Sequence, residues 1–169
     1  MKCLLLILAL MIPQMVMARI GETLEQCFER YGEDKEEKYG PSAPVGVKTY
    51  SFTKNGLVIE VSFWHGKAFQ VAYLFFKCEQ KLTVATFKKL QKANGGEREW
   101  GKLWEVSDRA KSAITVDKSM WGRYTLDSDG NLAYVTFSDK AAMDEVGKLL
   151  NELRAKEEEE KASKATDGL

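Results

Sequence analysis

The chain holds a single histidine, His65, within the stretch FWHGKAF. Histidine is the side chain that most often transfers protons near neutral pH, so any Ser/His/Asp or Cys/His site in this protein would have to use it. The sequence places no carboxylate beside it to orient or activate the ring. Gly66 follows it, and strand-like apolar segments flank it on both sides. We therefore predict that His65 lies at an exposed hairpin tip and is not catalytic.

Other patterns that carry chemistry are missing from the sequence. We find no Gly-rich phosphate loop, no CxxC motif and no cluster of metal ligands. The loop DSDGN is not a calcium loop, because Gly130 is fourth from Asp127 and the twelfth residue is Ser138. Acidic residues are abundant, and sequence does not show which of them converge, so a carboxylate pair stays open. We predict a protein that is not an enzyme and that holds no metal or cofactor.

The tryptophans suggest binding rather than catalysis. A flat apolar ring can contact a sugar or a protein partner, although most large aromatic side chains are core residues. Trp64 falls in the predicted loop, so we take Trp64 and His65 as candidate partner contacts. Two functions then compete: a protein-interaction or inhibitor-like module of the cell envelope, and binding of a carbohydrate or envelope polymer through exposed tryptophans. The four tryptophans are Trp64, Trp100, Trp104 and Trp121.

Residues 1–18, MKCLLLILALMIPQMVMA, predict export. Lys2 precedes a short apolar run, and small side chains stand at the two positions that a signal peptidase reads. The run is too short to favour a membrane-spanning helix, which needs about 20 apolar residues. We expect cleavage after Ala18, a secreted or periplasmic location and no stable membrane anchor in the mature protein.

Two cysteines, Cys27 and Cys78, remain after this cleavage. An exported chain meets an oxidising compartment, so the pair is a candidate disulfide. The alternative is that each is a small buried hydrophobic residue, since free cysteine is among the most buried residue types.

Charge and composition narrow the possible partners. The chain has 25 basic and 25 acidic residues, so without Lys2 the formal charge is near minus one. Binding to a phosphate backbone requires clustered positive charge, which argues against nucleic acid as a partner. A content of 44% hydrophobic and 11% aromatic residues is typical of a packed globular protein. We predict a single domain over 19–153.

Periodicity predicts helices and strands in alternation. The first helix has Thr23 and Gln26 as a capping box and ends at Gly32. A polar connector over 33–44 leads to a three-stranded meander within 49–76. The remaining elements are a helix capped by Thr83, strands at 103–108, 113–117, 122–126 and 131–137, and a third helix from Ser138 or Asp139 with an apolar stripe of Met143, Val146, Leu150 and Leu153. From Arg154 we expect the helix to fray into a charged mobile tail, 154–169.

Hairpin registers follow from keeping apolar side chains on one face. Asn55-Gly56 is a strong signal for a two-residue turn. At the second hairpin, a two-residue turn would set Val61 against Gln70, so we expect a three-residue loop of Trp64, His65 and Gly66. The predicted pairs are Phe52 with Ile59, Tyr50 with Val61, Val61 with Phe69, Ile59 with Val71, Leu126 with Leu132, and Tyr124 with Tyr134.

The first unit resembles a known family. In IGETLEQCFERYG, Gly21, Thr23, Gln26 and Gly32 stand where SmpA/OmlA outer-membrane assembly lipoproteins carry the same residue types. The resemblance covers roughly residues 20 to 76 and extends to the secreted β-lactamase inhibitor proteins, which double the same fold. It is otherwise similar to exported bacterial proteins without an assigned activity.

The order of the predicted elements indicates an α+β fold, with helices packed on an antiparallel meander sheet and a helix-strand-strand-strand unit repeated over 20–80 and 81–138, and the resemblance to the β-lactamase inhibitor proteins agrees with this. In the inhibitors, the sheet face holds the partner enzyme, but no residue motif for that contact carries over. The chain lacks the lipid-attachment cysteine that the lipoproteins carry after the apolar run.

Overall fold

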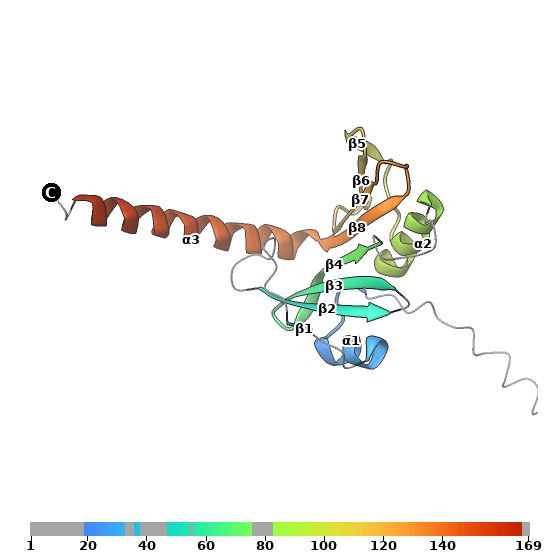
Figure 1. Ribbon diagram of the computed structural model, residues 1–169, viewed down its shortest axis with the longest axis horizontal. Coiled ribbons are helices and arrows are strands. Elements are labelled where there is room, and N and C mark those ends of the chain that lie inside the picture. The colour runs from blue at the N-terminus through green and yellow to red at the C-terminus, as the bar shows by residue number, and fades with distance from the viewer. Residues whose placement is uncertain (1–18, 33–35, 38–46, 55, 76–82, 167–169) are drawn as a thin grey trace, which may run out of the picture.

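The computed structural model describes residues 19–32, 36–37, 47–54, 56–75 and 83–166 (Figure 1). The predicted signal peptide and Cys78 lie outside these residues. No helix within the described ranges is both long enough and apolar enough to cross a membrane.

A single antiparallel sheet of eight strands organises the fold, in the order β1-β2-β3-β4-β8-β7-β6-β5. Two meanders lie side by side and meet where β4 pairs with β8. One helix precedes each meander along the chain and a third ends the fold, so the predicted α+β class with a meander sheet is confirmed. The elements are α1 (Leu24–Tyr31), β1 (Glu36–Glu37), β2 (Lys48–Lys54), β3 (Leu57–Trp64), β4 (Lys67–Leu74), α2 (Val84–Gly95), β5 (Trp104–Ser107), β6 (Ala110–Ile114), β7 (Met120–Leu126), β8 (Leu132–Asp139) and α3 (Lys140–Thr166).

The ends of α1 follow the predicted cap chemistry. The Gln26 N–H donates to Thr23 Oγ1 at 3.3 Å, and the Thr23 N–H donates to Gln26 Oε1 at 2.8 Å. Gly32 closes the helix with a φ of +86°, which glycine adopts without strain. At α2, Thr83 occupies the N-cap position without a side-chain cap bond. Inside the predicted polar connector, Glu36 and Glu37 pair with β2 as the short strand β1.

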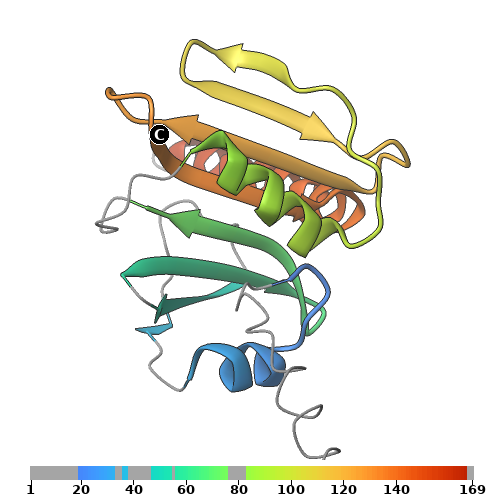
Figure 2. The same ribbon diagram turned by 90° about the vertical axis from the view of Figure 1, so that its right-hand side faces the viewer.

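Helices α1 and α2 cover the same face of the sheet, whereas α3 leaves from the opposite face (Figure 2). The main core lies under the first two helices because alternate residues of the central strands point there. Its fully buried members include Phe52 and Ile59 under α1, and Phe87, Leu90 and Phe137 around α2. A smaller cluster of Val47, Phe69 and Val146 joins α3 to the other face.

The second hairpin departs from the predicted register. His65 and Gly66 form a two-residue turn with φ values of +48° and +73°, as a type I′ turn requires, and Trp64 pairs with Lys67. A bulge beyond Ser62 then shifts the register, so that Val61 faces Val71 rather than Phe69. The predicted three-residue loop was wrong because a bulge can restore the apolar face after a tight turn.

The other predicted registers hold in part. Around the Gly56 turn, Phe52 pairs with Ile59 and Tyr50 with Val61, as predicted. In the last hairpin Leu126 pairs with Leu132, but a register shift after Thr125 sets Tyr124 opposite Val135, so the prediction for Tyr124 was wrong. This shift is again a local irregularity that strict alternation does not reveal.

Helix α3 is longer than the sequence predicted. It runs through Arg154 to Thr166, whereas we expected the helix to fray from Arg154. Val146 is 1% exposed and packs with Phe69, while Met143 and Leu150 are partly buried beside it. The last turns lie beyond the rest of the described chain (Figure 1). The predicted apolar stripe is therefore used for packing only in its first turns.

Two helix glycines provide a matched test of packing. A Cβ added at Gly95 would lie 2.7 Å from Trp100 Nε1, whereas one added at Gly147 meets nothing within 4 Å. We expect Gly95→Ala to lower the free energy of unfolding by about 1–3 kcal/mol through overpacking. Gly147→Ala should raise it by up to about 1 kcal/mol through helix propensity. Urea denaturation measures both, and equal effects at the two positions would contradict the packing seen at Trp100.

Candidate functional site

The predicted contact residues Trp64 and His65 lie at the tip of the β3–β4 hairpin, against the first turns of α3. His65 is exposed, and its Nε2 atom lies 3.3 Å from Glu145 Oε1. Trp64 ends β3 instead of lying in the loop, and its half-buried ring packs beside Met143 and Leu150. The carboxylate near His65 thus comes from a residue far away in sequence, and the pair is open to solvent.

Glu145 is held as a carboxylate by its neighbours. The Trp64 indole N–H lies outside strict hydrogen-bond geometry, yet it is the main cause of a lowered pKa at Glu145, followed by the hydrogen bond with His65. The His65–Glu145 contact thus links the hairpin tip to α3 at a solvent-exposed position.

An open groove runs from this hairpin tip to the start of α1. Its volume is about 470 Å³, and its lining contains both aromatic and charged side chains. Trp64 and His65 both line it, so the structure places the two predicted contacts in one concave surface. The full lining is Thr23, Leu24, Glu25, Lys48, Tyr50, Phe63, Trp64, His65 and Gly66.

The four tryptophans do not form one cluster. Trp64 lies in the groove, and Trp100 lines a pocket beside α2. Trp104 and Trp121 are 40% and 47% exposed, the largest aromatic exposure among the described residues. Sequence reasoning favoured Trp64 as the exposed ring, and the structure shows more exposure at these two.

Trp104 and Trp121 point away from α1 and α2. Paired residues on antiparallel strands point to the same face. Trp104 pairs with Ser112, Ser112 pairs with Arg123, and Trp121 pairs with Ile114. Gly122, the residue between Trp121 and Arg123, points to the core, where a Cβ would meet Phe137 and Trp100 at 3.0 Å. We call the resulting surface the tryptophan face: Trp104, Ile114, Trp121 and Arg123.

The alternation of side chains along β7 is the sequence pattern that could have identified this surface. Tyr124 is buried in the core, so Trp121 and Arg123, at odd spacing from it, must point to the other side. The sequence analysis identified the strand 122–126 but did not extend the alternation back to Trp121.

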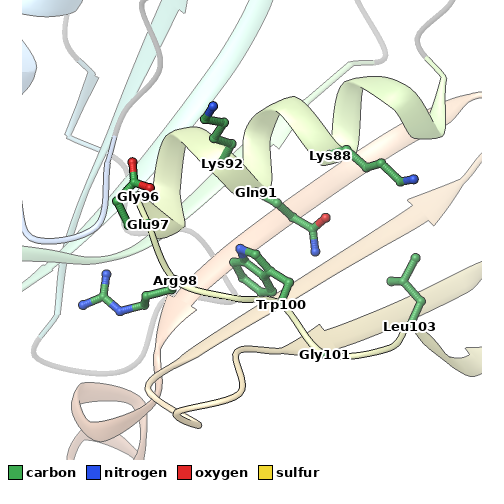
Figure 3. Close-up of a pocket in the computed structure, with 9 residues that line it drawn as sticks. All are labelled: Lys88, Gln91, Lys92, Gly96, Glu97, Arg98, Trp100, Gly101 and Leu103. Atoms are coloured by element: carbon green, nitrogen blue, oxygen red, sulfur yellow. The ribbon is translucent and has the colours of Figure 1, made fainter.

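A pocket of about 510 Å³ opens between α2 and the segment that follows it (Figure 3). Gln91 and Trp100 form its inner wall, with Leu103 at one side and Lys88 and Arg98 at opposite ends. Lys92, Gly96, Glu97 and Gly101 complete the lining. Sequence reasoning named none of these as a site except Trp100.

The loop between β6 and β7 holds Arg98 at the rim of this pocket. Arg98 Nε donates to Ser119 Oγ at 3.1 Å and lies 3.5 Å from Asp117 Oδ2. Asp117 accepts hydrogen bonds from the Thr115 hydroxyl and from the Ser119 backbone N–H, which together lower its pKa to about 2. The Thr115 bond is the larger cause.

Cys27 lies on the buried face of α1. It is fully buried and free, and the nearest polar group is Glu22 Oε2, at 4.0 Å. Glu22 is itself paired with Arg30. Burial, and then the Glu22 charge, raise the pKa of the Cys27 thiol to about 12. This matches the reading of Cys27 as a buried hydrophobic residue; Cys78 lies outside the described residues, so the pairing of the two stays a prediction.

The described carboxyl groups whose pKa is lowered lie in separate elements. Glu25 lies in α1, Asp117 in a loop and Glu145 in α3, and hydrogen bonds are the main cause of the lowered pKa at each. Within the described ranges, no group of three or more His, Cys, Asp and Glu side chains could hold a metal ion.

Comparisons with known proteins give little at the level of sequence. No protein-family model matches the chain, and no curated protein does. Two solved structures are similar to it in part, each at 12% identity over 72% of this chain: a cysteine-rich secretory protein from Staphylococcus aureus subsp. aureus Mu50, with a TM-score of 0.41, and an extracellular protein containing a SCP domain from Bacillus anthracis str. Ames, with a TM-score of 0.43. The match spans 45% and 44% of those chains. The resemblance to SmpA/OmlA lipoproteins stays an expectation.

The state of Cys27 can be checked by alkylation. Only the thiolate reacts, so a thiol with a pKa near 12 should resist iodoacetamide at pH 8 in the folded protein. The same thiol should react fully in denaturant. Peptide mass spectrometry without reductant reads Cys27 directly, and detection of a Cys27–Cys78 disulfide would contradict the free thiol.

Asp117 sets a pH dependence with a defined sign. Because its pKa is lowered on folding, its contribution to stability is present above the usual Asp pKa and is lost as the pH falls toward 2. Thr115→Val should move the Asp117 titration midpoint, followed by carboxyl NMR, upward toward the usual value. An unchanged midpoint would exclude the Thr115 hydroxyl as the main cause.

Proposed function

We propose that this chain is an exported, non-enzymatic protein-interaction module whose partner contacts the tryptophan face. The observation that supports it most is that Trp104 and Trp121, nearly half exposed, stand on the same side of the sheet beside Arg123. Tryptophan and arginine are the residue types that most often dominate binding energy at protein interfaces. Exposed large apolar side chains grouped on one face mark interaction sites more often than scattered ones do.

The surroundings of this face support a macromolecular partner over a small substrate. Val106 and Val116 are 48% and 61% exposed in the adjacent strand β5 and loop. Of the two pockets described above, only the groove at the hairpin tip contains the histidine, and its lining has one carboxylate, Glu25. The envelope location rests on the predicted signal peptide, residues 1–18.

The experiment is affinity capture from envelope extract with the purified protein beside a Trp121→Ser variant. Because Trp121 is 47% exposed and outside the main core, the variant should remain folded while it loses the captured partner, and its thermal unfolding is measured alongside. With that partner purified, Kd should rise by about tenfold or more, the range of an interface hot spot.

Val84→Ala is the matched control. Val84 is 38% exposed on α2, on the other side of the sheet, so its substitution should leave Kd unchanged. Capture of no protein, or equal loss in both variants, would rule out the tryptophan face as the contact surface.

A further inference from the structure

The pocket beside α2 has a feature that the proposed function does not use. It lies on the α2 side of the sheet (Figure 3), whereas the residues of the tryptophan face point to the other side. A ligand in this pocket would not compete with a protein bound at the tryptophan face, so its binding does not depend on the proposed function.

Trp100 is held rigidly in the wall of this pocket. A Cβ at Gly95 would collide with its indole nitrogen at 2.7 Å, and a Cβ at Gly122 would lie 3.0 Å from its ring. The ring also meets Phe137 edge-on, at a centroid distance of 5.7 Å. Two glycines thus make the slot that seats the indole, and the part left uncovered lines the pocket. A preorganised aromatic surface lowers the cost of binding.

Gln91 supplies a polar group beside that surface. The residue is only 9% exposed, and its amide projects into the pocket next to Trp100 (Figure 3). Among the described residues this amide has no hydrogen-bond partner, and it is open to the pocket rather than enclosed in the core. A ligand with hydroxyl groups would satisfy both its N–H donors and its carbonyl acceptor.

The rim of the pocket carries side chains that donate hydrogen bonds, Lys88, Lys92 and Arg98, and one carboxylate that accepts them, Glu97. Lys88 stands free at one end among the described residues, whereas Arg98 at the other end is already bound to Asp117 and Ser119. A volume of about 510 Å³ lies within the usual size of small-ligand sites.

We infer that this pocket binds a pyranose ring of a saccharide, with the apolar face of the sugar on Trp100 and its hydroxyl groups on Gln91 and Lys88. A sugar ring has an apolar face and a polar edge, which is the combination that the wall and the rim present.

Indole N–H signals in a proton–nitrogen NMR spectrum give a direct readout, because each tryptophan contributes one. The purified protein is titrated with trimers of glucose, of N-acetylglucosamine and of glucuronate. We expect a trimer to shift the Trp100 signal, assigned with Trp100→Phe, and to leave the Trp121 signal in place.

Gln91→Leu separates the amide from the shape of the pocket, because leucine nearly matches its volume and keeps the helix. Loss of its hydrogen bonds should weaken binding by about tenfold. Trp121→Ser serves as the control and should bind the trimer normally. No shift with any trimer at millimolar concentration, or binding that Gln91→Leu leaves unchanged, would overturn the inference.

Discussion

The ladder between β4 and β8 is the interaction on which the remaining structure depends. It is the contact that joins the two meanders into one sheet, through five residue pairs from Gln70–Ser138 to Leu74–Tyr134. The core-facing pairs are Val71 with Phe137 and Tyr73 with Val135, and all four side chains are fully buried. Each meander alone would be a four-stranded sheet with an open edge along a largely buried strand, β4 or β8.

Packing above this ladder fixes the helices that shape the pocket. Asn94 of α2 donates a hydrogen bond of 3.1 Å to the Tyr73 hydroxyl of β4, so the second helix is tied to the first meander as well as to its own. Phe87 stacks on Phe137 at 5.6 Å, and Trp100 meets the same ring edge-on. A change in the central ladder would therefore displace α2 and the pocket together.

Strand β7 shows how one segment serves two surfaces. Trp121 and Arg123 belong to the tryptophan face, while Gly122 between them gives Trp100 its space on the other side. Alternation along a strand makes this possible, because neighbouring side chains point to opposite faces. The proposed protein contact and the proposed sugar pocket are thus close along the chain and separated by the sheet.

Local patterns were enough to derive much of the fold. The capping box at Thr23 and Gln26, the registers around Gly56 and the strands after Trp100 follow from neighbours in sequence, because turns, caps and alternation act over a few residues. The bulge beyond Ser62, the place of Gln91 in the pocket wall and the approach of Glu145 to His65 depend on contacts between distant segments. Which face of a strand stays open depends on where the helices pack, so the tryptophan face and the pocket appear only when the whole chain is assembled.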